Sequence, residues 1–483
     1  MKKYVIIVSC ALVLFLTICL LPVAFSFFSS YKLIDIAYIT KSNPVNEEVD
    51  VYIGDVPRID FTQYVSSSVQ NLSHSIQGYD PQNPIIGEYT VHYSGQEQGH
   101  QFSKDILFTF WGFTKFAPGG EHVLGLTSKG EVYVWGSNQY SQLGLTGVTY
   151  VSTPTKLTSL PKIKDIAATN SSSFALDESG AIWSWGRNID NVLGDNGSTR
   201  STPQTINYSV SFKSLAGGGY NTMGAIGTDN YLYAWGNGKN GALGNGVNKE
   251  SNTVTRIYTG GTKMAQYSFN GGMFTNLNDE LFIFGSNDYG EMMSTNYSLH
   301  NQLPNKVTFL GNIKKLAAGY GMRMILNTNN NVWTWGDSRY NAVGHNISSG
   351  ERPNPQQIAT NAKDIAMNIG QGMVLKNDGS IIMFGENFSG QNASGSTAYT
   401  FSNSIYNPTF STDAIYCLNE TNLFFSKHQM YGVGQGTYGV LANGSTADQL
   451  ATVQWVFNPN PNAPFSRRMI ALKMVLKKEE YSL

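Results

Sequence analysis

The chain is 483 residues long, too long for one ordinary hydrophobic core, so several domains or one large repeat domain are expected. Only 13% of its residues are charged, about half the usual share, while its 50 glycines and many short apolar runs favour strands joined by tight turns. A net charge of −1 argues against a nucleic-acid partner, and three cysteines, two of them in the N-terminal apolar run, exclude a disulfide outside that run and a Cys/His metal site.

The N-terminal residues 1–30 predict a membrane anchor. Lys2 and Lys3 precede an apolar, uncharged stretch over 4–28. This stretch exceeds the roughly 7–15 apolar residues of a secretory signal and is longer than the roughly 20 that a transmembrane helix needs. The basic residues place the N-terminus in the cytoplasm, which predicts a single-pass protein of the cell membrane with its C-terminal part outside. The alternative is a secreted protein, cleaved near 24–26.

Residues 45–112 differ from the rest of the chain in their sequence pattern and predict a small β-sandwich. Apolar and polar residues alternate over 49–53, 87–94 and 105–110, with turn residues between them. The segment GEYTVHYS at 87–94 resembles a strand of bacterial immunoglobulin-like modules, which implies a stalk or spacer. A simpler alternative is that these strands decorate the following domain.

The segment 113–457 consists of seven tandem repeats, each with an aromatic residue followed by glycine. Successive aromatic residues are 50, 50, 49, 51, 49 and 47 residues apart. The seven pairs are Trp135-Gly136, Trp185-Gly186, Trp235-Gly236, Phe284-Gly285, Trp335-Gly336, Phe384-Gly385 and Tyr431-Gly432. Such regular spacing is the signature of a repeat architecture.

Other positions keep the same register and define four short strands in each repeat. Five residues before the aromatic stands Gly, Asn or Asp in the first six repeats, as at Gly130 and Asn230, which suits a hairpin turn. About eighteen residues before it stands alanine, as at Ala117 and Ala317, which suits strands crowded round an axis. Four strands make one propeller blade, so the fold class predicted is all-β with a seven-bladed β-propeller.

The repeat resembles that of the regulator-of-chromosome-condensation family. The segments WGSNQYSQLG at 135–144 and WGNGKNGALG at 235–244 are similar to its W-G-x-N-x-x-G-Q-L-G signature. The resemblance implies a seven-bladed propeller. Repeats four, six and seven depart from the signature, with Met292-Met293, Asn392-Ala393 and a shortened last repeat anchored on Tyr431, so irregular blades are expected towards the end of the ring.

Ring closure and the C-terminal tail complete the predicted domain order. No later repeat follows the strand-like segment Ala451–Phe457, so we expect it to pair with the sheet of the first repeat and close the ring. The tail 458–483 alternates apolar and partly charged residues, which predicts a strand or, alternatively, a basic amphipathic helix.

The sequence predicts binding rather than catalysis. It contains no G-x-S-x-G, H-E-x-x-H or phosphate-binding Gly-Lys-Ser/Thr motif, and its seven histidines show no metal-ligand spacing. We therefore expect no catalytic residues, no metal and no cofactor. The expected function is a membrane-anchored, extracytoplasmic interaction scaffold, predicted to be monomeric, for a protein or a cell-surface polymer. The alternatives are a secreted inhibitor of an extracellular enzyme and a propeller enzyme acting on cell-wall glycan.

The loops after the aromatic-Gly pairs are the predicted partner-binding site. Equivalent loops of a ring fall on one face, and these loops carry Tyr and Arg, which are favoured at interface hot spots. The alternative is that the aromatic residues only pack each loop on its own blade. The predicted residues are Tyr140, Arg187, Lys239, Tyr289, Arg339, Tyr340, Phe388 and Tyr438.

Overall fold

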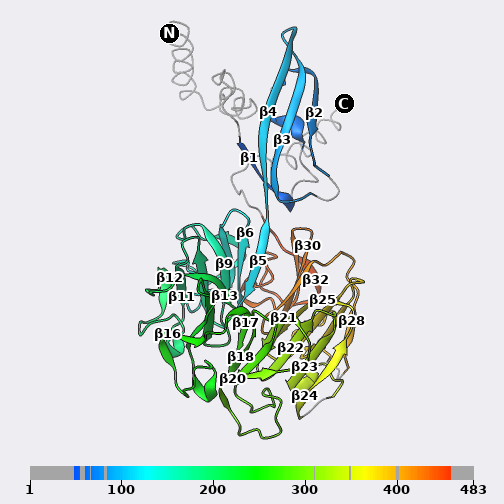
Figure 1. Cartoon of the computed structure of the whole chain (residues 1–483). Coiled ribbons are helices and arrows are strands. Elements are labelled where there is room, and N and C mark those ends of the chain that lie inside the picture. Colours follow the sequence, from blue (N-terminus) through cyan, green and yellow to red (C-terminus); the bar gives the residue numbers. More distant parts are fainter. Residues whose placement is uncertain are drawn as a thin grey trace. The chain divides into compact units, whose positions relative to one another are not determined.

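A computed structural model describes residues 48–457, apart from 55–59, 66, 81–83, 309, 348–349 and 399–401. The chain divides into two compact units, Met1–Trp111 and Gly112–Leu483 (Figure 1). In the described ranges both units consist of β-strands and a few short 3-10 turns. The predicted anchor 1–30 and the predicted tail structure over 458–483 lie outside the described residues.

The first unit contains one four-stranded sheet. Its strands are β1 (Glu48–Tyr52), β2 (Gln70–Ile76), β3 (Gly87–Glu97) and β4 (His100–Trp111), and the 3-10 turn η2 spans Phe61–Tyr64. The order is β1-β4-β3-β2, with β1 parallel to β4 and the other pairs antiparallel.

The alternation predicted for this unit is present, but the predicted sandwich is not shown. Val91, Tyr93, Ile106 and Phe108 are buried on one face of the sheet, where they pack with Phe61 of η2. The other face carries exposed polar residues, so a single packed face suffices. Among the described residues no second sheet faces the first, and the resemblance to an immunoglobulin-like module is therefore not supported by this topology.

The second unit contains, within the described residues, seven four-stranded sheets, each formed by four consecutive antiparallel strands. The first sheet is β5 (Phe113–Pro118), β6 (His122–Thr127), β7 (Val132–Ser137) and β8 (Tyr150–Lys156). The second is β9 (Ile163–Ala168), β10 (Ser172–Asp177), β11 (Ile182–Gly186) and β12 (Arg200–Thr205). The third is β13 (Phe212–Ala216), β14 (Thr222–Gly227), β15 (Leu232–Gly236) and β16 (Ser251–Tyr258). The fourth is β17 (Thr262–Ser268), β18 (Gly271–Asn276), β19 (Leu281–Gly285) and β20 (Asn301–Val307).

The last three sheets have the same strand order. The fifth is β21 (Ile313–Gly319), β22 (Met322–Asn327), β23 (Val332–Asp337) and β24 (Glu351–Ala359). The sixth is β25 (Ala362–Asn368), β26 (Gln371–Lys376), β27 (Ile381–Gly385) and β28 (Ser404–Tyr406). The seventh is β29 (Ala414–Cys417), β30 (Thr421–Ser426), β31 (Gln429–Gly434) and β32 (Gln449–Gln454). Short 3-10 turns η3 (Ile189–Asn191), η4 (Lys239–Gly241), η5 (Arg339–Asn341) and η6 (Thr437–Gly439) lie in four of the loops.

The first strand of each sheet lies innermost, beside the first strand of the next sheet (Figure 1). The cores lie between neighbouring sheets: Leu124 and Val134 of the first sheet pack with Ile166 and Trp185 of the second. The ring closes because Phe116 on β5 contacts Tyr416 on β29, with ring centroids 5.6 Å apart. This arrangement is that of a β-propeller.

The predicted turn and anchor residues adopt the backbone that their types favour. Asn230, between β14 and β15, has a φ of +67°, and the equivalent Gly130 has +76°. Gly136 has a φ of +98°, and a Cβ there would lie 2.4 Å from the Glu121 carbonyl oxygen. Glycine is therefore required after the buried aromatic for two reasons, its φ and this close approach.

The seventh repeat has its anchor at Val433-Gly434, not at the predicted Tyr431-Gly432. Gly434 pairs with Thr421 as Gly136 pairs with His122, and a Cβ on Gly434 would lie 2.4 Å from the Glu420 carbonyl oxygen. Val433 is fully buried where other repeats place Trp or Phe. The last interval, from Phe384 to Val433, is thus 49 residues, and the repeat is not shortened.

Tryptophan side chains link consecutive sheets through hydrogen bonds. Trp185 Nε1 donates to the Gln142 carbonyl oxygen of the preceding sheet's loop at 2.9 Å. Trp235 and Trp335 make the same bond to the loops that precede them, and Trp135 donates to the Val440 carbonyl oxygen at 3.0 Å. The bond from Trp135 joins the first sheet to the seventh.

The predicted mode of ring closure is wrong. Strand β32 pairs with β31 of its own sheet, so Ala451–Phe457 adds no strand to the first sheet. Each repeat already supplies all four strands of its own sheet. The first sheet therefore needs no strand from the end of the chain. The segment contributes side chains instead: Trp455 and Phe457 contact Phe113, at centroid distances of 5.3 and 5.1 Å.

Within the described residues no helix combines the length and the apolar character needed to cross a bilayer. This finding corrects the predicted location in the cell membrane with the C-terminal part outside. Apolar side chains of the described residues fill the cores between neighbouring β-sheets.

Candidate functional site

One end of the second unit carries both an axial hollow and the predicted binding loops. In every sheet the turn between strands one and two and the loop between strands three and four leave from the same end, because neighbouring strands are antiparallel. We call this end the loop end. In the first sheet it comprises 119–121 and 138–149.

The axial hollow is lined by the ends of the innermost strands. It is open to solvent, and the empty space in and above it amounts to about 410 Å³. In every repeat one equivalent residue lines the hollow. It lies two positions before the first paired residue of the second strand. These residues are Gly120, Asn170, Tyr220, Phe269, Tyr320, Ile369 and Asn419. Among the described residues no charged side chain lines the hollow.

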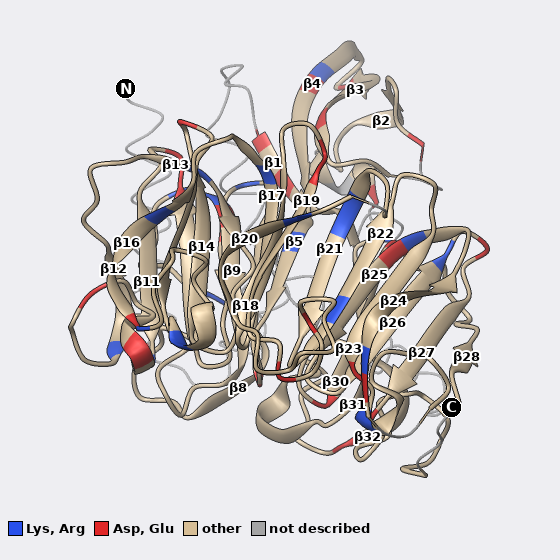
Figure 2. Cartoon of the chain, turned by 60° about the horizontal axis from the view of Figure 1, so that its bottom comes forward, with Lys and Arg blue, Asp and Glu red and all other residues tan. Residues whose placement is uncertain are grey.

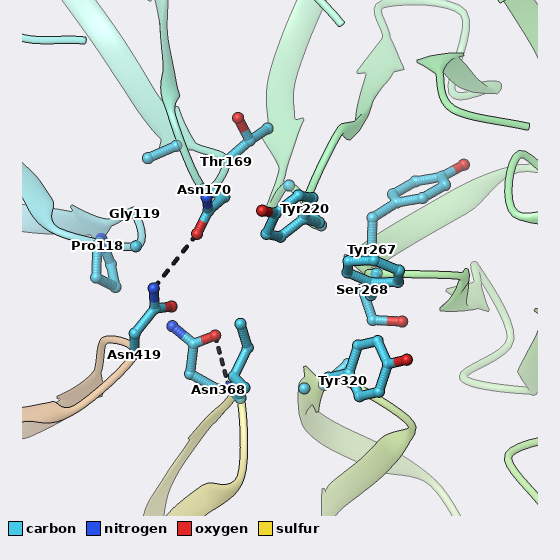
Figure 3. A pocket seen from close by; sticks show the side chains of 18 residues that line it. Pro118, Gly119, Thr169, Asn170, Tyr220, Tyr267, Ser268, Tyr320, Asn368 and Asn419 are labelled. Carbon is cyan, nitrogen blue, oxygen red and sulfur yellow. Dashed lines mark hydrogen bonds between the residues drawn. The ribbon is translucent and has the colours of Figure 1, made fainter. Parts of the chain in front are cut away.

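The hollow has two chemically different walls (Figure 3). Tyr220, Phe269 and Tyr320 form an aromatic arc, with centroid distances of 4.8 Å between the first two and 4.6 Å between the last two. Asn170 and Asn419 lie on the opposite side, where the Asn419 amide donates to the Asn170 carbonyl oxygen at 3.4 Å. This ring was not predicted from the sequence, because its seven positions share no residue type.

The aromatic arc continues outward into the predicted site. Tyr320 and Tyr289 lie 5.5 Å apart by ring centroid, and their hydroxyl oxygens are 3.3 Å apart. The hydrogen bond with Tyr289, together with burial, raises the pKa of Tyr320 to about 12. Arg339 lies over the Tyr289 ring at 4.8 Å and is held by Asp337, whose carboxylate accepts from it at 2.6 Å.

The predicted residues form two groups on the loop end rather than one continuous patch. The first group, which we call the first patch, consists of Tyr140, Arg187 and Tyr438. Arg187 lies over the Tyr140 ring at 4.3 Å, and the Tyr438 hydroxyl accepts a hydrogen bond from Gln139 at 2.6 Å. These residues belong to sheets two, one and seven, which are neighbours in the ring.

The second patch comprises Tyr289, Arg339, Tyr340 and Phe388 of sheets four, five and six. Tyr340 and Phe388 contact each other at 5.6 Å by ring centroid, and both remain exposed. Lys239, in the third sheet's loop, is exposed and lies in neither patch, since no contact joins it to the other predicted residues in the described part of the chain.

Two of these tyrosines have an unfavourable backbone. Tyr340 has a φ of +56° and Tyr438 a φ of +60°, whereas the equivalent positions in sheets two and three carry Asp190 and Asn240, at +53° and +55°. Asp and Asn adopt the left-handed region more readily than Tyr, so these positions hold an aromatic ring at a conformational cost. Strain of this kind gathers at functional sites.

Charged residues are spread thinly over the second unit, with both signs intermixed (Figure 2). Four carboxylates nevertheless interact at the loop end. Burial and the nearby Glu420 raise the pKa of Glu121, and burial, Glu420 and Asp337 raise the pKa of Glu386. None of them lines the hollow, so the hollow lacks the paired carboxylates of a glycan-cleaving site.

These shifts predict a pH dependence of stability. The folded chain keeps protons on Glu121 and Glu386 that the unfolded chain releases, so the free energy of unfolding should fall as pH rises above about 4.5. Glu420→Gln removes the shared negative neighbour and keeps an oxygen to accept from Ser389 Oγ. We expect a smaller fall in this variant, by less than about 1 kcal/mol near pH 7, measured by urea unfolding across that range. Glu178→Gln, at an exposed ion pair with Lys162, is the control; equal pH profiles for wild type and Glu420→Gln would contradict the coupling.

Comparisons with known proteins agree with this architecture. Family models for the regulator of chromosome condensation (RCC1) repeat match residues 129–176, 179–225 and 113–142. Human WBSCR16 is similar in structure, with a TM-score of 0.61, 17% identity, and coverage of 68% of this chain and 94% of that protein. Yeast RCC1 (Prp20) bound to Kap60 has a TM-score of 0.60, 18% identity, and coverage of 68% and 84%. Saccharomyces cerevisiae Prp20p, described for its binding to Gsp1p and histones, has a TM-score of 0.60, 17% identity, and coverage of 72% and 88%. The chain therefore carries RCC1 repeats, and its second unit folds as an RCC1-like β-propeller.

Proposed function

We propose that this protein is an interaction scaffold whose seven-bladed propeller binds a protein partner through the loop end. Structurally similar RCC1 propellers bind proteins, among them Kap60, Gsp1p and histones. Their identity to this chain is below one fifth, so they support the class of function and not the partner. The contacts to the partner are proposed from this chain's own loops.

The observation that carries the proposal is the strained, exposed Tyr340. Its side chain is 44% exposed, its neighbour Phe388 is 52% exposed, and its backbone lies in the left-handed region. A fold-only role does not require an aromatic ring here, since Asn240 occupies the equivalent position of the third sheet. Aromatic rings with an adjacent arginine such as Arg339 are the composition of interface hot spots.

A substitution that separates stability from binding tests this proposal. The partner is first identified by cross-linking the full chain in its native cells and is then purified. Tyr340→Asn should raise the free energy of unfolding by about 0.5–1 kcal/mol, because Asn tolerates the left-handed backbone. The same variant should weaken partner binding by about tenfold or more, because a hot-spot ring is lost. Urea unfolding and calorimetric titration measure the two effects.

Two further variants, one in the first patch and one in the outer strand β28, are compared with Tyr340→Asn. Tyr140→Ala reports whether the partner also contacts sheets seven, one and two. Ile405→Ala removes a still more exposed apolar side chain from β28, outside both patches, and should leave binding unchanged. Wild-type affinity in Tyr340→Asn and Tyr140→Ala together would reject the loop end as the binding surface.

A further inference from the structure

The axial hollow differs from the two patches in chemistry, because it is enclosed by uncharged residues of all seven sheets. We propose that it is a second binding site, for a pyranose ring of a neutral saccharide. The hollow is open to solvent, so the remainder of a longer saccharide can extend out of it.

The aromatic arc offers a wall for the apolar face of a sugar ring. Tyr220, Phe269 and Tyr320 are only partly buried, so part of each ring faces the solvent-filled hollow. Phe269 lies between the two tyrosines and contacts both. A pyranose presents axial C–H groups on one face, and these pack on aromatic rings as other apolar groups do.

The amide wall offers both donors and acceptors to hydroxyl groups. A primary amide can donate two hydrogen bonds and accept two, which suits hydroxyls that do both. In the described structure the Asn419 side-chain carbonyl oxygen accepts no hydrogen bond, and its amide makes only the 3.4 Å contact to Asn170. Asn368 beside it is oriented by the backbone N–H of Ile369, which donates to its carbonyl oxygen at 2.8 Å.

The division into two walls favours a saccharide over other ligands of this size. An anionic ligand would find no cationic side chain in the lining, and a cationic ligand no carboxylate. A peptide segment would need regularly spaced partners for its own N–H and C=O groups, whereas the amides gather on one side only (Figure 3). A sugar ring has one apolar face and a polar edge, which matches the hollow.

The test is calorimetric titration of the full chain with named trisaccharides. Cellotriose, maltotriose and triacetylchitotriose are the neutral probes, trigalacturonate is the charged one, and a capped hexaproline represents a neutral peptide. We expect at least one neutral trisaccharide to bind and trigalacturonate not to bind. Phe269→Ala and Asn419→Leu should each weaken that binding about tenfold. Phe269→Tyr, which keeps an aromatic ring, should bind as wild type does.

Matched variants keep the outcome decisive. Tyr340→Asn lies outside the hollow and should bind the saccharide as wild type does, so failure of the protein-binding proposal and failure of this one remain distinguishable. Asn419→Leu keeps the branched shape of the side chain and serves if Phe269→Ala does not fold. The proposal is overturned if no neutral trisaccharide binds, if binding survives loss of both walls, or if trigalacturonate or hexaproline binds in their place.

Discussion

Trp135→Ala is expected to lower the free energy of unfolding by about 3–5 kcal/mol, as large-to-small substitutions in a core do. The Trp135 side chain is fully buried, and its Nε1 donates to the Val440 carbonyl oxygen of the seventh sheet's loop at 3.0 Å. Phe116 and Trp455 contact its ring, each with centroids 6.1 Å away. Truncation therefore removes packing and a hydrogen bond where the first and seventh sheets meet. The shift of the urea unfolding midpoint of the full chain measures the loss.

Trp135→Phe separates the two contributions. Phe284 and Phe384 occupy the equivalent buried position in sheets four and six, so the fold accommodates this ring. The substitution keeps most of the packing but leaves the Val440 carbonyl oxygen without its donor, at an expected cost of about 1–2 kcal/mol. Trp185→Phe is the matched variant away from the junction. A Trp135→Ala variant as stable as the surface variant Tyr140→Ala would disprove the role assigned to this residue.

Asp165→Ala is expected to cost about 2–4 kcal/mol, because Asp165 of the second sheet bonds to both the first and the third sheet and is nearly buried. Its Oδ1 accepts from Lys115 Nζ of the first sheet at 2.5 Å. Its Oδ2 accepts from the backbone N–H of Leu215 in the third sheet at 2.7 Å. Alanine would leave that N–H buried without a partner. The midpoint of urea unfolding is again the measurement.

The opposite side of the ring repeats the arrangement and provides an internal control. Asp364 accepts from Lys315 at 2.5 Å and from the backbone N–H of Ile415 at 3.2 Å. Asp364→Ala should therefore cost a similar amount. Lys115→Met should cost less than about 1 kcal/mol, because the lysine is half-exposed and solvent screens its charge. If Lys115→Met proved as damaging as Asp165→Ala, the backbone bond to Leu215 would not be the main contribution.

The sequence predicted strands and turns well where backbone conformation constrains residue type. Gly130 and Asn230 have the positive φ expected of them, and all seven repeats form four-stranded sheets. The register of the seventh repeat was predicted two residues too early, because Val433 replaces the aromatic side chain there. The glycine after it is the stricter requirement, since no Cβ fits beside the preceding turn.

The candidate site was only partly predictable, for a physical reason. The loop positions share residue types, so Tyr140, Tyr289 and Tyr340 could be assigned to one end from spacing. The cross-sheet pairing with Arg187 and Arg339 depends on how adjacent sheets pack, which spacing does not encode. The axial ring shares no residue type: Gly120, Asn170 and Phe269 are equivalent in position and in nothing else. Only the three-dimensional register brings such residues together.

The absence of a shared strand between the first and seventh sheets, within the described residues, gives the ring a seam. Successive sheets elsewhere are joined by the continuous chain, whereas this junction is held by side chains such as Trp135, Phe116 and Trp455 and by loop contacts. The first and seventh sheets are thus joined by side-chain and loop contacts and not by a common strand. Because every sheet is complete in itself, a whole repeat could be gained by duplication or lost by deletion without breaking a sheet. Only the contacts between the first and last sheets would need to adapt.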